Sequence, residues 1–436
     1  MKLSIKKLML LTLILLPFEA IPHIMPSIYR PISVYPLSIM GVVYLIKNIK
    51  NNKINRIDLD FIVFGIYAIV SGIMLSYLKF NSLSAFMDFL LTFILGLFSF
   101  FGANYGFEKF RQAENSNEEY IYTVLSFLSK VYTFVLIIGV IELLCELGIL
   151  PHAIIRGIYT FSGGRQYNRV CLLSAEASWA SIHIILMFVI FYFKLTIDKK
   201  NIYIINIAFA GIIFIYNMSG QGILIACTMV FVYLIIAFFV LHNKKIIKFG
   251  LIFTIVIILG YFLIQTVLPY MSSSYYVNRL RDFTNINNMI HNDGSSFVRL
   301  VYPKIAVLIF FNNILFGIGA GNFCNMLGVY INKYYSWALI KYQEVYQHVL
   351  FNIEQTGCLY TRLLSETGIV GTILFMKPVI NILKKVKYVC DSYYINIILL
   401  VLTLTISSVI QMDSFVYEIF WVMLAFVNNL TKERQA

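Results

Sequence analysis

The sequence predicts an all-α integral membrane protein with about twelve transmembrane helices and one large extracytoplasmic loop between the ninth and tenth helices. Hydrophobic residues make up 60% of the 436 residues and charged residues only 13%, whereas a soluble domain has roughly 45–50% and 25%. The apolar runs are about 17 to 25 residues long without strand-like alternation, which is the length that a helix needs to cross a bilayer. Basic residues lie at the ends of these runs, so the net charge of +13 orients the chain in a membrane and does not indicate nucleic-acid binding.

The helices follow from the apolar runs, which are centred near residues 15, 39, 68, 92, 132, 184, 209, 231, 260, 368, 402 and 422. The first run resembles a signal peptide, but Phe18 stands where a small residue is needed before Ala20. We therefore interpret it as an uncleaved first helix. With an even number of spans and both termini in the cytoplasm, every short cytoplasmic loop is basic, as the positive-inside rule requires.

This path divides the chain into three parts. Residues 1–269 hold the first nine helices and an external segment at about 148–174, residues 270–358 form the large external loop, and residues 359–436 hold the last three helices. Inside the large loop, the amphipathic pieces 302–311 and 334–351 are too short or too polar to cross, so we expect them to lie on the membrane surface or to cap a cavity. At Cys324 and Cys358, two free thiols are favoured over a disulfide, and the cysteine spacing indicates no metal site.

Arginine is concentrated on the predicted outside. Only Arg56, Arg111 and Arg434 lie inside, and the other arginines lie outside. Arginine snorkels or pairs at helix ends as readily as lysine, which is enough to explain one such residue. For the whole outside set we favour an anionic ligand, because a planar guanidinium binds phosphate, pyrophosphate or carboxylate through two parallel hydrogen bonds. We expect the side chains of Arg165, Arg169 and Arg299 to clamp a pyrophosphate.

Two residues are candidate catalysts. Glu176 lies at the outer mouth of the sixth helix, where an ionisable group faces a cavity or a partner. Two interpretations stay open: a general base whose pKa is raised by a dry setting, or a structural ion pair with Arg165 or Arg169. His348 is external and has the chemistry of a base, although a lone loop histidine is usually a surface residue.

Two motifs resemble cofactor sites and are set aside. The GxGxG run that begins at Gly317 lacks the final spacing of a dinucleotide fingerprint and follows no strand, so we expect a turn or close packing there. Asp58 and Asp60 imitate the DxD of metal-dependent glycosyltransferases, but they start the third helix, where acidic residues interact favourably with the helix dipole. We expect no cofactor and no metal.

Three short motifs in order resemble those of the O-antigen polymerase and ligase superfamily of polytopic membrane glycosyltransferases. Glu176-Ala177-Ser178 resembles the Glu-Pro-Ser element of that family, and Phe316-Gly317-Ile318-Gly319 with Asn322-Phe323 resembles its plfGvG-gnf segment. The stretch from Glu366 and Gly368 to Gly371 resembles its E-x-G-i-i-G element. The resemblance implies a GT-C-like fold in the bacterial inner membrane, with Ser178, Gly317, Gly319, Glu366 and Gly368 as motif residues.

The resemblance also implies an activity. It is a metal-independent, inverting transfer of a glycan from undecaprenyl pyrophosphate to a lipid-linked repeat unit of O-antigen or capsular polysaccharide, at the periplasmic face. Membrane lipids, a chain-length regulator and a flippase are the implied partners. Ala177 replaces the family proline, and Gly357-Cys358 stands where ligases have His-Asn, with His348 nine residues too early, which favours polymerase over ligase. A flippase of lipid-linked oligosaccharides, or another transporter, is the second alternative, and it needs polar groups through the membrane depth.

Overall fold

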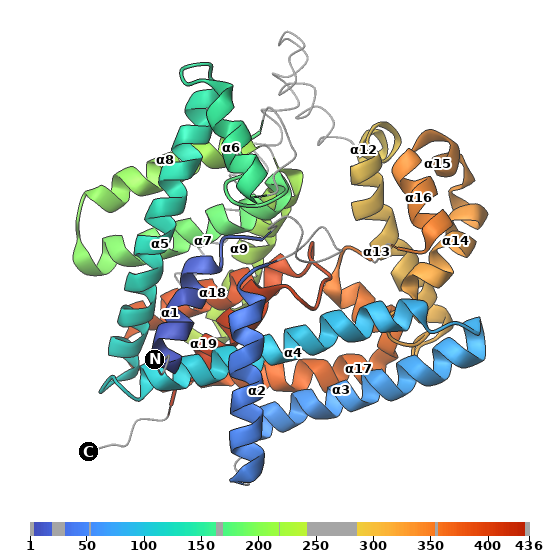
Figure 1. Cartoon of the computed structure of the whole chain (residues 1–436), viewed down its shortest axis with the longest axis horizontal. Coiled ribbons are helices and arrows are strands. Elements are labelled where there is room, and N and C mark those ends of the chain that lie inside the picture. Colours follow the sequence, from blue (N-terminus) through green and yellow to red (C-terminus); the bar gives the residue numbers. More distant parts are fainter. Residues whose placement is uncertain are drawn as a thin grey trace.

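The computed structural model describes residues 4–19, 31–51, 54–162, 169–217, 219–241, 286–353 and 356–431. All regular structure in these ranges is helical (Figure 1). The first part contains α1 (Ile5–Leu15), α2 (Val34–Lys50), α3 (Arg56–Leu75), its π-helical continuation η1 (Ser76–Phe80), α4 (Ser84–Arg111), α5 (Asn117–Glu146), α6 (His152–Ser162), α7 (Ala177–Asp198), α8 (Ile202–Asn217) and α9 (Gly220–Leu241). The second contains α12 (Ile286–Asn292), α13 (Gly294–Asn312), α14 (Phe323–Tyr334), α15 (Ser336–Lys341) and α16 (Gln343–Phe351). The third contains α17 (Leu359–Leu383), the 3-10 helix η3 (Lys384–Tyr388), α18 (Ser392–Ser408) and α19 (Glu418–Asn428).

The helices confirm a membrane-embedded, all-helical protein. Every predicted centre lies in a helix except the one near residue 260, which is outside the described residues. Six helical stretches are long and apolar enough to cross a membrane: Arg56–Phe80, Ser84–Arg111, Asn117–Glu146, Ala177–Asp198, Gly294–Asn312 and Leu359–Tyr388. The shorter apolar helices include α8, α18 and α19. The number of twelve spans and the GT-C-like topology remain predictions.

Aromatic packing and small residues hold the membrane helices together. Phe64 of α3 meets Phe375 of α17 edge-on, with ring centroids 5.1 Å apart, and Phe61 meets Trp421 of α19 at 5.5 Å. Where α2 crosses α4, a side chain at Gly102 would overlap the backbone of α2. Because lipid provides little hydrophobic drive between helices, such close approach through small residues is a main source of their packing energy.

Hydrogen bonds between the helix ends fall into two sets. Ends that the sequence places outside contact one another: Arg169 with Asn217, Gln221 with Gln411, Lys79 with Asn313, and Arg362 with Asp413. Ends that it places inside do the same: Arg111 with Thr431, Tyr122 with Asp198, Glu118 with Cys390, and Asn117 with Tyr388. In the described part of the chain none of these bonds joins the two sets. The alternating path itself remains a prediction.

Helices α12 to α16 form an outer subdomain with its own hydrophobic core, which includes Phe297, Tyr302 and Phe323. They gather on one side of the molecule, away from α7 and α8 (Figure 1). By length and composition α13 is able to cross a membrane, yet Arg299 near its start and Asn313 after its end both contact residues of the outside set. The predicted segment 302–311 forms the second half of α13, and its place on the membrane surface or over a cavity stays a prediction. The predicted piece 334–351 is divided among the end of α14, α15 and α16.

Candidate functional site

A buried carboxylate of α5 holds the backbone before Glu176 in place. Glu142 of α5 is fully buried, and its two oxygens accept the backbone N–H groups of Cys171 at 3.0 Å and Leu172 at 2.8 Å. Leu172 has a φ of 56°, a conformation that costs a non-glycine residue free energy and persists only where its surroundings impose it. The two hydrogen bonds to Glu142 therefore fix the segment that leads into α7.

Hydrogen bonds to Asn217, the last residue of α8, fix the same segment. The Nε of Arg169 donates to the carbonyl of Asn217 at 2.9 Å, and the amide of Asn217 donates to the carbonyls of Val170 at 2.7 Å and Ala177 at 2.8 Å. Arg169 is only 8% exposed. Arg169, which was predicted to bind pyrophosphate, thus helps to fix the segment that leads into α7. Arg165 lies outside the described residues.

Glu176 precedes the first residue of α7, and three of the predicted site residues meet there. The Nη2 of Arg299, on α13, lies 3.4 Å from Oε2 of Glu176, and each side chain is 30% exposed. The hydroxyl of Ser178 donates to the same carboxylate oxygen at 2.8 Å. The partner of Glu176 in the described residues is therefore Arg299, which is 123 positions away in sequence, and not Arg169.

Sequence reasoning missed a second carboxylate at this place. Glu344 lies at the start of α16, and its Oε2 is 3.6 Å from where a side chain on Gly294 of α13 would begin. Although the residue as a whole is exposed, burial of its carboxyl raises the pKa of Glu344; Arg299 opposes this shift, while Glu176 and Asp293 add to it. In the sequence, the only feature that points to Glu344 is its position four residues before His348, and this spacing does not by itself indicate a site.

We call Glu176, Ser178, Arg299 and Glu344 the outer cluster. Its members come from α7 or its N-cap, α13 and α16, so it joins the membrane helices to the outer subdomain. Among the described residues, Nη2 is the one nitrogen of the Arg299 guanidinium that contacts an acceptor, so the other N–H groups have none. The outer cluster therefore combines a partly exposed guanidinium with two carboxyl groups in different environments.

His348 has a different environment from that predicted. It is 8% exposed, and its Nδ1 shares a hydrogen bond of 3.0 Å with the hydroxyl of Tyr302 in the core of the outer subdomain. Burial lowers the pKa of His348 to about 4. A neutral, packed imidazole with so low a pKa is a weak base at neutral pH, so its placement favours a structural role over the predicted catalytic one.

The two glycine motifs dock against each other. Helix α17 is broken at Gly368, whose φ is 64° and ψ −168°, and the turn 314–319 fills the break. Its N–H groups at Ile318 and Gly319 donate to the carbonyls of residues 365 and 366 at 2.9 and 2.8 Å, and the N–H of Ile369 donates to the carbonyl of Ile314 at 2.9 Å. Gly317 and Gly319 have positive φ values of 69° and 93°. The predicted turn with close packing is confirmed, and its hydrogen bonds pair backbone groups on both sides of the break in α17.

Glu366 fastens this arrangement. It is 1% exposed and accepts the N–H of Gly321 at 2.9 Å and the Nε of Arg362 at 3.2 Å. Arg362 also donates to the carbonyl of Asp413 at 3.0 Å and lies over the ring of Phe415 at 5.2 Å. These contacts give Glu366 and Arg362 a structural role that positions the loop after α13.

The acidic pair of the DxD-like motif serves helix packing. Tyr44 donates to Asp58 at 2.6 Å, and Lys377 of α17 pairs with Asp60 at 2.6 Å. The two carboxylates thus have different partners, which supports the interpretation that they hold no metal together. All six cysteines, Cys324 and Cys358 included, are free thiols.

Comparison with known proteins gives no match: no family model matches the chain, and no curated protein matches it. The resemblance to the O-antigen polymerase and ligase superfamily accordingly rests on the three motifs alone.

Proposed function

We propose that the protein is an oligosaccharide repeat-unit polymerase, which transfers a glycan from undecaprenyl pyrophosphate to a lipid-linked repeat unit on the extracytoplasmic side of the bacterial plasma membrane. The observation that carries the proposal is the outer cluster, in which Arg299 pairs with Glu176 beside the first turn of α7 and exerts an electrostatic effect on Glu344. A lipid-borne donor presents a pyrophosphate at the membrane surface. A partly exposed guanidinium that still has free N–H groups is suited to bind it.

The proposed reaction assigns one task to each charged group. A hydroxyl of the acceptor sugar attacks the anomeric carbon of the donor glycan from the face opposite the pyrophosphate. The new C–O bond forms as the bond to pyrophosphate breaks, so the configuration inverts and undecaprenyl pyrophosphate leaves with the electron pair. Arg299 stabilises the negative charge that develops on this leaving group, and a carboxylate takes the proton of the hydroxyl.

Of the two carboxylates, Glu344 is the better proton acceptor. Glu176 is engaged by Arg299 at 3.4 Å and by Ser178 at 2.8 Å, so its carboxyl group orients the guanidinium. Glu344 has no such direct partner among the described residues, and its raised pKa brings it nearer to the operating pH, where a general base is most effective. We therefore assign the proton transfer to Glu344 and a positioning role to Glu176.

One observation favours a transporter as the second candidate. Glu19 and His183 are 0% and 1% exposed within the helical core, with Nε2 of His183 3.1 Å from Oε1 of Glu19, and the hydroxyl of Tyr132 lies 2.9 Å from Nδ1 of His183. Ionisable residues inside a membrane often mark a substrate or proton pathway. A flippase would use such a pair, whereas the polymerase does not need it.

The location of the accumulated intermediate separates these functions. In a strain that lacks the chromosomal gene, we expect Glu344→Gln to leave single lipid-linked repeat units on the outer leaflet, where they are open to glycosidase added to spheroplasts. Units that remain protected on the inner leaflet would refute the polymerase and support the flippase. Full-length polymer that stays on undecaprenyl pyrophosphate would instead support the ligase, which differs only in its acceptor.

A further inference from the structure

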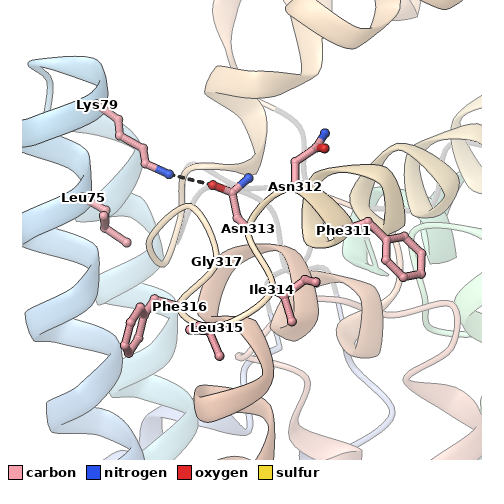
Figure 2. Close-up of a pocket in the computed structure, with 9 residues that line it drawn as sticks. All are labelled: Leu75, Lys79, Phe311, Asn312, Asn313, Ile314, Leu315, Phe316 and Gly317. Atoms are coloured by element: carbon pink, nitrogen blue, oxygen red, sulfur yellow. Dashed lines mark hydrogen bonds between the residues drawn. The ribbon is translucent and has the colours of Figure 1, made fainter.

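A shallow pocket opens between the end of α3 and the turn that follows α13. It has a volume of about 390 Å³ and is lined by Leu75, Lys79 and residues 311–317 (Figure 2). We call it the Lys79 notch. Figure 2 shows Lys79 reaching across it to the amide oxygen of Asn313, and the hydrogen bond is 2.8 Å long.

The rim of the Lys79 notch is apolar and exposed. Phe311, Leu315 and Phe316 expose 57–65% of their surfaces, and the neighbouring Leu78 exposes 71%. So many large apolar side chains on one surface of a membrane-embedded protein indicate contact with lipid. An irregular backbone is tolerated at such depth only when its polar groups are paired, and the carbonyls of residues 314 and 315 are paired with N–H groups of α17 at 2.9 and 3.3 Å.

Lys79 supplies the charge of this apolar surface. Among the described residues no acidic side chain forms an ion pair with Lys79, and the ammonium donates a hydrogen bond to the neutral Asn313. An ammonium has three N–H donors, so two remain for a ligand. A cation beside an apolar surface fits a molecule that is anionic at one end and hydrocarbon beyond it, which is the chemistry of a lipid phosphate.

The distance to the outer cluster indicates which lipid phosphate. Arg299 and Asn312 at the notch are thirteen positions apart in α13, which corresponds to about 20 Å along the helix. The proposed reaction uses two lipid-linked substrates, and only the donor breaks its bond at the pyrophosphate. The acceptor reacts through a sugar hydroxyl that is several sugars away from its own pyrophosphate. Its pyrophosphate must therefore be held at a distance from Arg299.

We propose that the Lys79 notch binds the pyrophosphate of the lipid-linked acceptor, with its polyprenyl chain over Phe311 and Phe316. This inference rests on the proposed polymerase function. It predicts two separate polyprenyl pyrophosphate sites on one chain: Arg299 serves the donor and Lys79 the acceptor.

Native mass spectrometry of the purified full-length chain, with undecaprenyl pyrophosphate as the probe, tests the proposal. We expect two bound lipids on the wild type, one on Lys79→Gln, and two on Lys79→Arg, which keeps the positive charge. Lys333→Gln is the matched control, because Lys333 is also an exposed lysine of the predicted outside, and it should keep both lipids.

The results distinguish failure of this inference from failure of the proposed function. Two lipids on Lys79→Gln, or only one on the wild type, would overturn the acceptor site while leaving the donor site at Arg299 intact. Displacement of the second lipid by phosphatidylglycerol at equal concentration would also overturn it, since the notch would then be an ordinary phospholipid site. Absence of any bound undecaprenyl pyrophosphate on the wild type would instead refute the polymerase itself.

Discussion

Replacing Arg299 by lysine separates the ligand-binding role of this residue from its contribution to stability. The contact between Arg299 and Glu176 is 3.4 Å long and each side chain is 30% exposed, so its loss should change the free energy of unfolding by no more than about 1 kcal/mol. Lysine keeps the positive charge but loses the planar fork. If the guanidinium stabilises charge on the leaving pyrophosphate, we expect Arg299→Lys to lower the transfer rate by about 10²- to 10³-fold, which is typical for the loss of one preorganised donor.

The assay measures both quantities on the same purified protein. Transfer is followed as chain growth from a lipid-linked repeat unit in detergent, and stability is followed by thermal unfolding. Lys304→Arg is the matched control, because Lys304 is an exposed residue of the same helix, and it should change neither. Full-length chains from Arg299→Lys would refute the clamp, and a rate that falls only in proportion to lost folded protein would reduce Arg299 to a structural residue.

Three further predictions follow from the structure. Because burial raises the pKa of Glu344, the transfer rate of the wild type should fall as the pH drops through that raised pKa and the base is protonated. Glu344→Gln should transfer slowly at every pH. If the variant kept the pH–rate profile of the wild type, Glu344 would not be the base. Gly368→Ala should lower the free energy of unfolding by about 2 to 5 kcal/mol, because the backbone conformation of Gly368 is nearly restricted to glycine and a side chain would overlap the carbonyl of Leu315. Gly157→Ala is the control, because Gly157 has open space around it. Equal melting temperatures for the two variants would contradict the break in α17. Burial lowers the pKa of His348 from 6.5 to about 4, so the unfolded chain binds a proton that the folded state does not. The free energy of unfolding of the outer subdomain should therefore fall by about 3 kcal/mol as the pH drops from 6.5 to 4. His348→Gln should reduce this pH dependence in circular dichroism melts, and an equally steep loss would show that another group titrates.

The helices could be predicted because they depend on local sequence. A run of apolar residues about 20 long is stable in a bilayer only as a helix, since hydrocarbon offers no partner to a free backbone group. The basic ends then orient each span in turn. The turn at Gly317 was also predictable from local sequence, because only glycine adopts such backbone angles at little cost.

The outer cluster could be predicted only in part. Glu176 and Arg299 were recognised by residue type and by the side of the membrane, but nothing in the sequence shows that they pair across 123 positions. Glu344 was missed because an acidic residue at the start of a helix is ordinary, and it gains its special environment only when α16 packs against α13.

The sequence by itself therefore determined that this is a helical membrane protein and predicted that most of its arginines lie outside, since apolar length and terminal charge act through the bilayer and need no tertiary contact. Only the tertiary structure decided which of the charged groups meet. Tertiary packing brought Arg299 of α13 to Glu176 at the N-cap of α7 and placed Glu344 of α16 within the electrostatic field of both. The same packing buried His348 against Tyr302, because a side chain's charge and reactivity depend on neighbours that are distant along the chain.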